Sequence, residues 1–466
     1  MTPSRGAGAD PEAPGGGDPA APVAPALLPM TAEIGADGRL RVGGCDLIEL
    51  AQEFDTPLFV YDEAHLRARC RDAVEAWGDG VAYATKAFLC MAMARLAHEE
   101  GMCLDVSTGG ELHVALSAGV PAERLVLHGS NKSDAELAAA LAVGVGRIVI
   151  DSFDEIDRLE RIVPLSRPGL EETASASSAS PTASSAGFRP RVLARITPGV
   201  EVHTHEFVRT GQDDSKFGFG LASGAAARAV ARLTELHRQE VVEFVGIHAH
   251  LGSQVFALAP FVQAIEVLAE FFAPLSLPEL VVGGGLGVPY VNGEEAPPMA
   301  QWAAAVRQAC RLAGIPDSVR VTAEPGRSIV AAAGITLYRV GTVKEVVGHR
   351  TYVSVDGGMS DNPRPVLYGS GYEAFLPRCA DAARPLPVRV VGKHCETGDV
   401  VVSEGYVPDD LTVGDILATP VTGAYGHSMA SNYNKVPRPA VVFVSGGQAR
   451  IVVRRETFDD LVRLDV

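Results

Sequence analysis

Lys86 is the side chain whose type and position suggest the most chemistry. It lies in the segment Tyr83–Phe88, at the end of an apolar run that begins at Val81. A lysine that closes a buried strand usually extends its amine to the solvent at the rim. In an enzyme pocket, however, such an amine can form a Schiff base with a carbonyl compound. Lys86 is therefore a candidate for Schiff-base chemistry.

Three further polar motifs each follow an apolar run directly, and they begin at His250, Gly283 and Glu324. The glycines Gly283–Gly285 either make a tight turn or leave backbone N–H groups open to an anion. The imidazole of His250 is flat enough to stack on a heteroaromatic ring, although a histidine satisfied within the core is the alternative. Ser253 follows His250 closely enough to donate to the same anion.

The segment Glu324-Pro325-Gly326-Arg327 combines two charges of opposite sign. A carboxylate beside a pyridine nitrogen keeps that nitrogen protonated and makes the ring an electron sink. The guanidinium of Arg327 offers a planar fork for a carboxylate. An internal ion pair between Glu324 and Arg327 is the alternative that the spacing leaves open.

The four motifs need a fold that brings strand ends together. Short apolar runs alternate with helical patterns, which predicts repeated βα units and a parallel sheet. We expect a (β/α)₈ barrel, because function collects at the carboxyl ends of its strands. The candidate strands are 58–61, 81–85, 103–106, 124–128, 147–151, 192–196, 244–249, 280–282 and 320–323.

The composition and the pattern of the sequence change after the barrel motifs. Beyond Arg327, runs rich in Val, Thr and Gly alternate with turn signals, which predicts a mostly antiparallel β-domain of sandwich or barrel type. The expected organisation is a disordered tail over 1–30, strands that join the β-domain over 31–56, the barrel over 57–325 and the β-domain over 326–466. The Ser/Ala-rich stretch 166–187 is expected to be a flexible insertion.

Charge and cysteine usage narrow the classes of partner. The formal net charge is −17 at pH 7, whereas a protein that binds nucleic acid or an acidic membrane surface needs a basic patch to neutralise the phosphates. We therefore expect a small-molecule ligand, and neither nucleic acid nor a membrane as partner. The seven cysteines lack CxxC or His-rich spacing, which predicts reduced thiols in the cytoplasm and no metal site.

Taken together, the four barrel motifs resemble the pyridoxal-phosphate decarboxylases of the alanine-racemase-like fold, over roughly residues 45 to 440. The C-terminal half resembles the diaminopimelate decarboxylase branch. Ornithine and arginine decarboxylases are not expected to carry its Asn-Pro-Arg-Pro and Ser-Asn-Tyr-Asn segments. The motifs of this half are 356–365, 367–368, 392–399, 423–429 and 431–434.

The resemblance implies a role for each residue of the motifs. Lys86 would hold pyridoxal 5'-phosphate covalently, and Cys395 would return a proton after CO₂ leaves. The other cofactor-binding residues would be His250, Ser253, Gly283, Gly284, Gly285, Glu324, Pro325, Gly326, Arg327 and Tyr425. The substrate-binding residues would be Arg327, Arg364, Tyr368, Glu396 and Tyr425. His203 and His205 also look typical of the family, without a clear role.

The resemblance further implies the reaction, which is the decarboxylation of meso-2,6-diaminopimelate to L-lysine and CO₂ at the end of lysine biosynthesis. It also implies a homodimer in which two subunits share each active site. An ornithine- or lysine-type decarboxylase, a racemase and a non-catalytic homologue that binds the cofactor are the alternatives. The pair Cys395-Glu396 argues against a racemase, which has no use for it.

Overall fold

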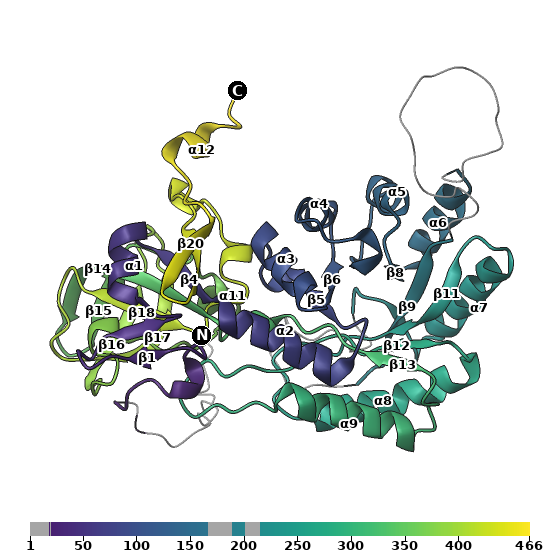
Figure 1. The fold of residues 1–466 in the computed structure, drawn as a ribbon, viewed down its shortest axis with the longest axis horizontal. Helices are drawn as coiled ribbons and strands as arrows, with labels where there is room; N and C mark the ends of the chain where they lie inside the picture. The colour runs from purple at the N-terminus through teal and green to yellow at the C-terminus, as the bar shows by residue number, and fades with distance from the viewer. Residues whose placement is uncertain (1–17, 19, 166–188, 201–214) are drawn as a thin grey trace, which may run out of the picture.

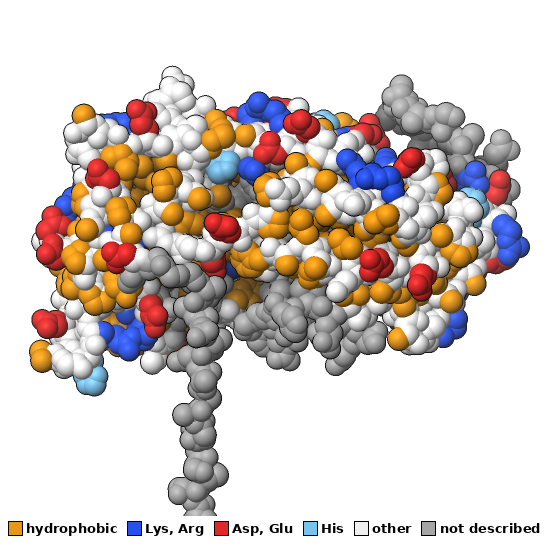
Figure 2. Space-filling model, turned by 90° about the horizontal axis from the view of Figure 1, so that it is seen from below, with side chains coloured by type: hydrophobic (Ala, Val, Ile, Leu, Met, Phe, Trp, Pro, Cys, Tyr) orange, Lys and Arg blue, Asp and Glu red, His pale blue; other side chains and the backbone are white. Residues whose placement is uncertain are grey.

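The computed structural model describes residues 18, 20–165, 189–200 and 215–466. A parallel sheet with helices around it lies beside a second domain that consists mainly of strands (Figure 1). In the view of Figure 2, acidic and basic side chains lie interspersed among apolar ones. Among the described residues, every helix is too short or too polar to span a bilayer.

Eight parallel strands form the barrel, and neighbours along the chain are neighbours in the sheet. Backbone hydrogen bonds close the ring, since the Ala82 N–H donates to the Ala323 carbonyl over 3.0 Å and the Ala84 N–H to the Pro325 carbonyl over 3.1 Å. The predicted (β/α)₈ barrel is therefore confirmed. Its strands are β5 (Ala82–Ala84), β6 (Cys103–Val106), β7 (Leu125–Leu127), β8 (Arg147–Ile150), β9 (Arg191–Thr197), β11 (Glu243–His248), β12 (Glu279–Val281) and β13 (Arg320–Thr322). The short β10 (Phe219–Gly220) pairs with β9.

The helices between these strands cover the outside of the barrel (Figure 1). Aromatic rings join three of them, because Trp302 contacts Trp77 at 4.7 Å and Phe261 at 5.2 Å between ring centroids. Such large buried rings contribute much of the packing between helices. The helices are α2 (Glu63–Trp77), α3 (Met91–Glu99), α4 (Gly109–Ser117), α5 (Asp134–Val143), α6 (Phe153–Leu165), α7 (Ala225–Arg238), α8 (Ala259–Phe272) and α9 (Met299–Leu312).

The second domain is a mostly antiparallel sheet, as predicted, but its central part includes a strand from the N-terminal side of the barrel. β4 (Leu58–Asp62) lies between β14 (Gly334–Val346) and β19 (Ala440–Ser445). The prediction that 58–61 is a barrel strand is therefore wrong. All five residues of β4 are buried, and a strand covered on both faces has the same apolar run in either domain. The remaining strands are β15 (Arg350–Val355), β16 (Leu386–Val391), β17 (Val400–Val407), β18 (Ile416–Pro420) and β20 (Gln448–Val453).

The N-terminal segment differs from its prediction in two ways. β1 (Glu33–Ile34), β2 (Leu40–Val42) and β3 (Cys45–Asp46) form a three-stranded sheet of their own and do not join the larger one. Residues 20–30, expected to belong to a disordered tail, pack on the β-domain: Leu27 is buried, and the carbonyls of Ala20 and Ala21 accept hydrogen bonds from Arg384. Residues 1–17 and the stretch 166–187 lie outside the described residues.

Candidate active site

A cavity of about 440 Å³ opens at the carboxyl ends of the barrel strands. Its volume suits a cofactor or other small ligand. Most of the lining follows barrel strands, and Tyr425 comes from the β-domain. The predicted residues in the lining are Lys86, His250, Ser253, Gly284, Gly285, Glu324, Gly326, Arg327 and Tyr425.

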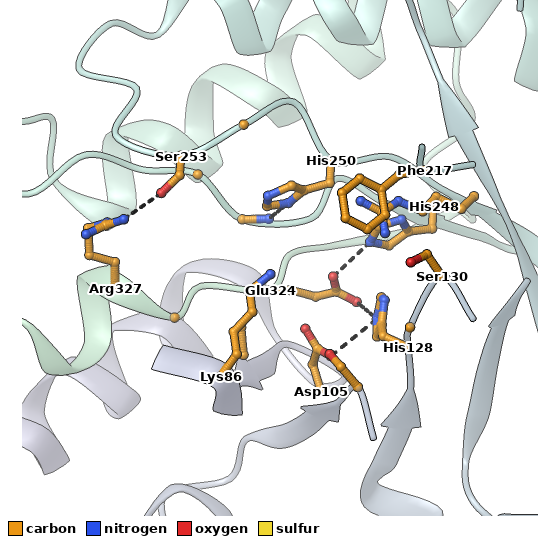
Figure 3. Close-up of a pocket in the computed structure, with 18 of the residues that line it drawn as sticks. Lys86, Asp105, His128, Ser130, Phe217, His248, His250, Ser253, Glu324 and Arg327 are labelled. Atoms are coloured by element: carbon orange, nitrogen blue, oxygen red, sulfur yellow. Dashed lines mark hydrogen bonds and ion pairs between the residues drawn. The ribbon is translucent and has the colours of Figure 1, made fainter. Parts of the chain in front are cut away.

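Lys86 lies on the short 3₁₀ turn Thr85–Ala87 that follows β5. The β-domain holds this turn in place, because the Tyr425 backbone N–H and the Ser428 hydroxyl both donate to the Ala87 carbonyl, at 2.8 and 2.9 Å. In Figure 3 the lysine side chain points toward Glu324 and His250. The contact between the two domains thus fixes the backbone of Lys86, whose amine lies in the cavity.

Glu324 lies at the centre of the site and forms a hydrogen bond with a histidine at each of its two carboxylate oxygens (Figure 3). Its Oε1 lies 2.8 Å from Nε2 of His128, and its Oε2 lies 2.8 Å from Nε2 of His248. Burial disfavours the ionised carboxyl, but the charge of His128 and the hydrogen bonds of both histidines outweigh it and hold the Glu324 pKa well below its ordinary value. The site therefore has a fixed buried carboxylate.

The two histidines differ in charge. Burial lowers the pKa of His248 to about 4, so its ring is neutral. Burial also acts on His128, but the carboxylates of Asp105 and Glu324 outweigh it and raise the His128 pKa. The pKa values of the two partners of Glu324 thus shift in opposite directions. The ligand atoms of the three residues lie within 4.8 Å of one another and could hold a metal ion, although both histidines already bond to the Glu324 carboxylate.

His250 offers a flat, uncharged face, because burial lowers its pKa well below the ordinary value. Its Nδ1 accepts a hydrogen bond of 3.0 Å from the Gly284 N–H, which fixes the plane of the ring. That N–H is therefore not open to an anion, contrary to the prediction for this glycine. A Cβ on Gly284 would lie 2.5 Å from the Glu324 carbonyl oxygen, so only glycine lets the two strand ends approach this closely.

Arg327 spans the far end of the cavity. Its Nη2 donates to the Ser253 hydroxyl and its Nη1 to the Tyr290 hydroxyl, both over 2.8 Å. Its guanidinium also lies 4.7 Å from the centre of the Tyr425 ring. The internal ion pair with Glu324, which the sequence left open as the alternative, is not formed, since the Glu324 carboxylate bonds to the two histidines. Arg327 is therefore available to bind an anion.

Comparison with known proteins identifies the family. The model of the pyridoxal-dependent decarboxylases, pyridoxal binding domain, matches residues 63–331. Diaminopimelate decarboxylase of Mycobacterium tuberculosis is 46% identical over 465 residues, which cover 95% of this chain and 98% of the relative. The chain belongs to the diaminopimelate decarboxylase family. The Bacillus subtilis enzyme of the same name is 44% identical, with 92% and 95% of the two chains covered.

Solved structures of the family agree with this assignment. The diaminopimelate decarboxylase of M. jannaschii superimposes with a TM-score of 0.82 at 30% identity, covering 94% of this chain and 98% of that one. The Helicobacter pylori enzyme, solved in complex with L-lysine, gives a TM-score of 0.76 at 30% identity, with 90% and 98% covered. The predicted resemblance and the predicted fold are therefore confirmed.

Membership of the decarboxylase family makes pyridoxal phosphate the cofactor, and the cavity fits it. A neutral ring face at His250 suits the pyridine ring, and the ionised Glu324 suits its nitrogen. The Lys86 amine suits the aldehyde. Ser253 provides a donor for a phosphate, together with the turn at Gly285, where φ is +115° and a Cβ would lie 2.6 Å from the Gly252 carbonyl oxygen.

The remaining predicted residues of this family member lie outside the main cavity. Gly283 and Pro325 lie in the backbone behind its lining. Arg364 is buried behind Tyr290, and its guanidinium lies 4.2 Å from the centre of that ring. Tyr368 lines a second hollow of about 530 Å³ on another side of Lys86, shared with Ser428 and Met429. The distal binding residues thus form two groups, not one surface.

Cys395 and Glu396 do not line either hollow around Lys86. Cys395 is exposed, and its backbone N–H donates to Oδ1 of Asn434 over 3.2 Å. The Tyr433 hydroxyl donates to Oε2 of Glu396 over 3.5 Å. Within one chain the predicted proton donor therefore lies outside the cavity that contains the predicted amine. His203 and His205 lie outside the described residues.

Several lining residues were missed from the sequence. Asp105, His128 and Arg195 lie at or directly after the carboxyl ends of predicted strands, so the rule that found Lys86 could have found them. Tyr290 and Tyr372 gave no such signal, because they lie in connections whose path depends on the packing of the two domains. The missed lining residues include Asp105, His128, Ser130, Asn131, Arg195, Phe217 and His248, and the missed residues that contact the two arginines outside the lining are Tyr290 and Tyr372.

Proposed function

We propose that the protein decarboxylates meso-2,6-diaminopimelate to L-lysine and CO₂, the last step of lysine biosynthesis. The observation that carries the proposal is the site itself: a lysine amine and a carboxylate held ionised by two histidines, beside an arginine that has no carboxylate partner among the residues the structure describes. The names and the high coverage of the relatives support the same reaction.

When bound, pyridoxal phosphate supplies an electron sink that stabilises the negative charge left by the departing CO₂. Lys86 would hold the cofactor through its amine. Glu324 would keep a proton on the ring nitrogen, because its own pKa is too low for it to take that proton. His250 would cover the ring and exclude water from it. Ser253, Gly285 and Tyr425 would hold the phosphate.

Substrate choice rests on the end of the molecule that does not react. Arg327 and Arg364 have no ion pair with any carboxylate among the described residues, as the contacts of both show. A buried guanidinium binds a carboxylate strongly and is left unpaired by a ligand that lacks one. Ornithine has no distal carboxylate, so the site discriminates against it. Tyr368 and Glu396 complete the contacts to the distal amino-acid end.

A homodimer with shared sites accounts for the position of Cys395. The thiol is exposed and outside the cavity of its own chain, whereas the hollow beside Lys86 and Tyr368 is open to a segment from outside. In a two-fold dimer, the segment 393–396 of each subunit enters this hollow of the other. Cys395 then donates the proton that replaces CO₂, and Glu396 binds the distal ammonium. All seven cysteines are free, which supports a reducing cytoplasm as its location.

Product analysis tests the proposal. The purified holoenzyme is incubated with meso-diaminopimelate, L-ornithine or L-lysine, and the products are separated by chiral chromatography while CO₂ is trapped. We expect L-lysine and CO₂ in equal amounts from meso-diaminopimelate, and little turnover of the other two. Faster release of CO₂ from ornithine or lysine would replace the proposal with a diamine-forming decarboxylase. A normal cofactor spectrum without turnover of any of them would indicate a non-catalytic homologue.

A further inference from the structure

The two arginines of the distal site are buried without a counter-ion in the part of the chain that the structure describes. Arg327 is 8% exposed and Arg364 is 3% exposed, and neither forms an ion pair with a described carboxylate. The Nε atoms of both are buried and have no hydrogen-bond partner among the described residues. Two unpaired buried charges of the same sign are costly unless other groups stabilise them. The groups that surround them in place of carboxylates are tyrosines.

Tyr290 is the side chain that contacts both arginines. It lies in the connection between β12 and α9 and is buried. Its hydroxyl accepts a hydrogen bond of 2.8 Å from Nη1 of Arg327, and its ring lies 4.2 Å from the guanidinium carbon of Arg364. The negative face of an aromatic ring attracts a guanidinium, and more strongly where water is excluded. One side chain thus positions an arginine of the barrel and an arginine of the β-domain.

Tyr372 continues the arrangement on the other side of Arg364. Its hydroxyl accepts a hydrogen bond of 2.7 Å from Nη1 of Arg364, and its ring meets that of Tyr290 edge to face at 5.2 Å. Burial comes first among the causes that raise the Tyr372 pKa to about 12. This hydroxyl therefore keeps its hydrogen at neutral pH.

Arg327, Arg364, Tyr290 and Tyr372 form one cluster, and its polar groups are nearly all hydrogen-bond donors. Both tyrosine hydroxyls accept from an arginine, and for neither is an acceptor of its own hydrogen found among the described residues. The arginines have no acceptor capacity at all. The cluster has a positive charge of two and unused donors, with one of its members, Arg327, exposed to the cavity. Such a set fits the oxygens of a carboxylate and repels an ammonium.

We propose that Tyr290 is a specificity-determining positioning residue, which couples Arg364 to Arg327 so that Arg327, with the charge of Arg364 behind it, binds the distal carboxylate of the substrate. The proposal deepens the proposed function and rests on it for the identity of the substrate. The tyrosine does not touch the reacting atoms. It acts by fixing the direction of the Arg327 donors and by holding the charge of Arg364 close behind them.

Tyr290→Phe tests the hydroxyl alone, because the ring beneath Arg364 stays. We expect the KM for meso-diaminopimelate to rise about tenfold, the order expected for the loss of one hydrogen bond to a charged group. We expect kcat to stay within about twofold, because a distal contact serves binding more than the chemical step. Tyr290→Leu also removes the ring and should raise KM about a hundredfold. Tyr406→Phe, at a half-buried tyrosine of β17 away from the cavity, is the matched control.

A binding measurement separates this proposal from the proposed reaction. Pimelate has both carboxylates of the substrate and no amino group, whereas 1,5-diaminopentane has both ammonium groups and no carboxylate. Calorimetry on the holoenzyme should show pimelate binding weakened about tenfold in Tyr290→Phe, with 1,5-diaminopentane binding unchanged or tighter. Equal pimelate affinity in wild type and Tyr290→Phe would overturn the proposal.

The outcomes for the two proposals differ. A wild type that does not decarboxylate meso-diaminopimelate contradicts the proposed function, while the loss of pimelate binding in Tyr290→Phe still supports the coupling. Should kcat fall with KM unchanged, the residue acts in the chemical step and the inference is wrong. Since Tyr290→Leu creates a cavity, its thermal unfolding is compared with that of wild type, and Tyr290→Phe carries the test if the leucine variant does not fold.

Discussion

The charge of Glu324 depends on its neighbours more than on its own chemistry. Alone in a buried site this carboxyl would take up a proton, because burial disfavours the anion. The pKa of His128 is raised and that of His248 is lowered, and both rings bond to the carboxylate at 2.8 Å. The ability of the site to keep a pyridine nitrogen protonated therefore depends on these two histidines.

Replacing His128 by Asn should make the ionised form of Glu324 less stable. The variant loses the positive charge beside Glu324, so burial dominates and the Glu324 pKa rises. Because activity needs the ionised carboxylate, the acid limb of the kcat/KM profile should move to higher pH. The loss of one charge-assisted hydrogen bond should lower kcat/KM at neutral pH by about tenfold to a hundredfold.

The pH profile of turnover and the absorbance spectrum of the bound cofactor measure both effects. His113→Asn, at an exposed histidine of α4, is the control. An acid limb that does not move in His128→Asn would mean that His248 alone keeps Glu324 ionised.

Lys86 should carry the cofactor. Its turn is fixed from the β-domain through the Ala87 carbonyl, and its side chain points into the cavity (Figure 3). Reduction of the holoenzyme with borohydride and peptide mapping should place the pyridoxyl group on Lys86, and Lys86→Ala should abolish turnover. Labelling of Lys344 or Lys393 instead would assign the cofactor to another site.

At the scale of single residues, the sequence predicted the groups that follow strands and missed those placed by tertiary packing. Lys86, Glu324 and Arg327 were found because each comes directly after an apolar run. Tyr290 and Arg364 meet only because the two domains pack together. The Gly284 N–H was expected to face an anion, yet it bonds to His250, and no spacing in the sequence indicates that partner.

At the scale of elements, the turn between β15 and α11 (Arg364–Tyr368) carries a buried carboxyl. Asp361 accepts hydrogen bonds of 2.7 Å from the Gly358 N–H and from the Tyr338 hydroxyl. Burial, aided by the charges of Asp356 and Asp399, raises the Asp361 pKa to about 7. This turn leads into the helix that begins with Arg364. Ionisation of Asp361 therefore affects an element that carries a residue of the distal site.

Asp361 should make the stability of the fold depend on pH. In the unfolded chain an aspartate has a pKa of about 3.9, so the folded state binds the proton more tightly. The stabilisation is complete below about pH 4 and is lost as pH rises through the folded pKa of about 7. Asp361→Asn cannot ionise. Relative to wild type it should gain up to about 4 kcal/mol in the free energy of unfolding between pH 4 and pH 8.

Denaturant unfolding at several pH values measures that difference, and Asp317→Asn, at an exposed position, is the control. A difference between Asp361→Asn and wild type that is the same at all pH values would show that Asp361 is ionised in the folded protein throughout. The constant cost of the amide's altered hydrogen bonds cancels in this comparison.

The same apolar pattern explains why the barrel strands were predicted correctly and why β4 was assigned to the wrong sheet. The eight barrel strands were found because buried parallel strands are continuous apolar runs between turn signals. β4 has the same kind of run, since its five residues are all buried. Its assignment to the other sheet depends on pairing with β14 and β19, which are distant in sequence, and local patterns do not contain that information.

At the scale of the whole molecule, the proposed dimer makes a quantitative prediction. Lys86→Ala and Cys395→Ala are each expected to be inactive. In a random mixture half of the dimers are mixed, and one of their two sites carries neither change, so roughly a quarter of all sites should regain activity. If subunit exchange is demonstrated with differently tagged chains and no activity returns, Lys86 and Cys395 act in the same chain.

The position of β4 also has a consequence for how the protein is made. Its neighbours β14 and β19 follow the whole barrel in sequence, so the ribosome releases β4 long before either partner exists. The barrel is one continuous segment and is able to fold during translation, as domains commonly do. The β-domain can close only when β19 emerges, and Tyr425, which comes just before it, holds the turn of Lys86. We therefore expect an unfinished chain to have a barrel without a fixed Lys86 turn, and activity to begin only after synthesis is nearly complete.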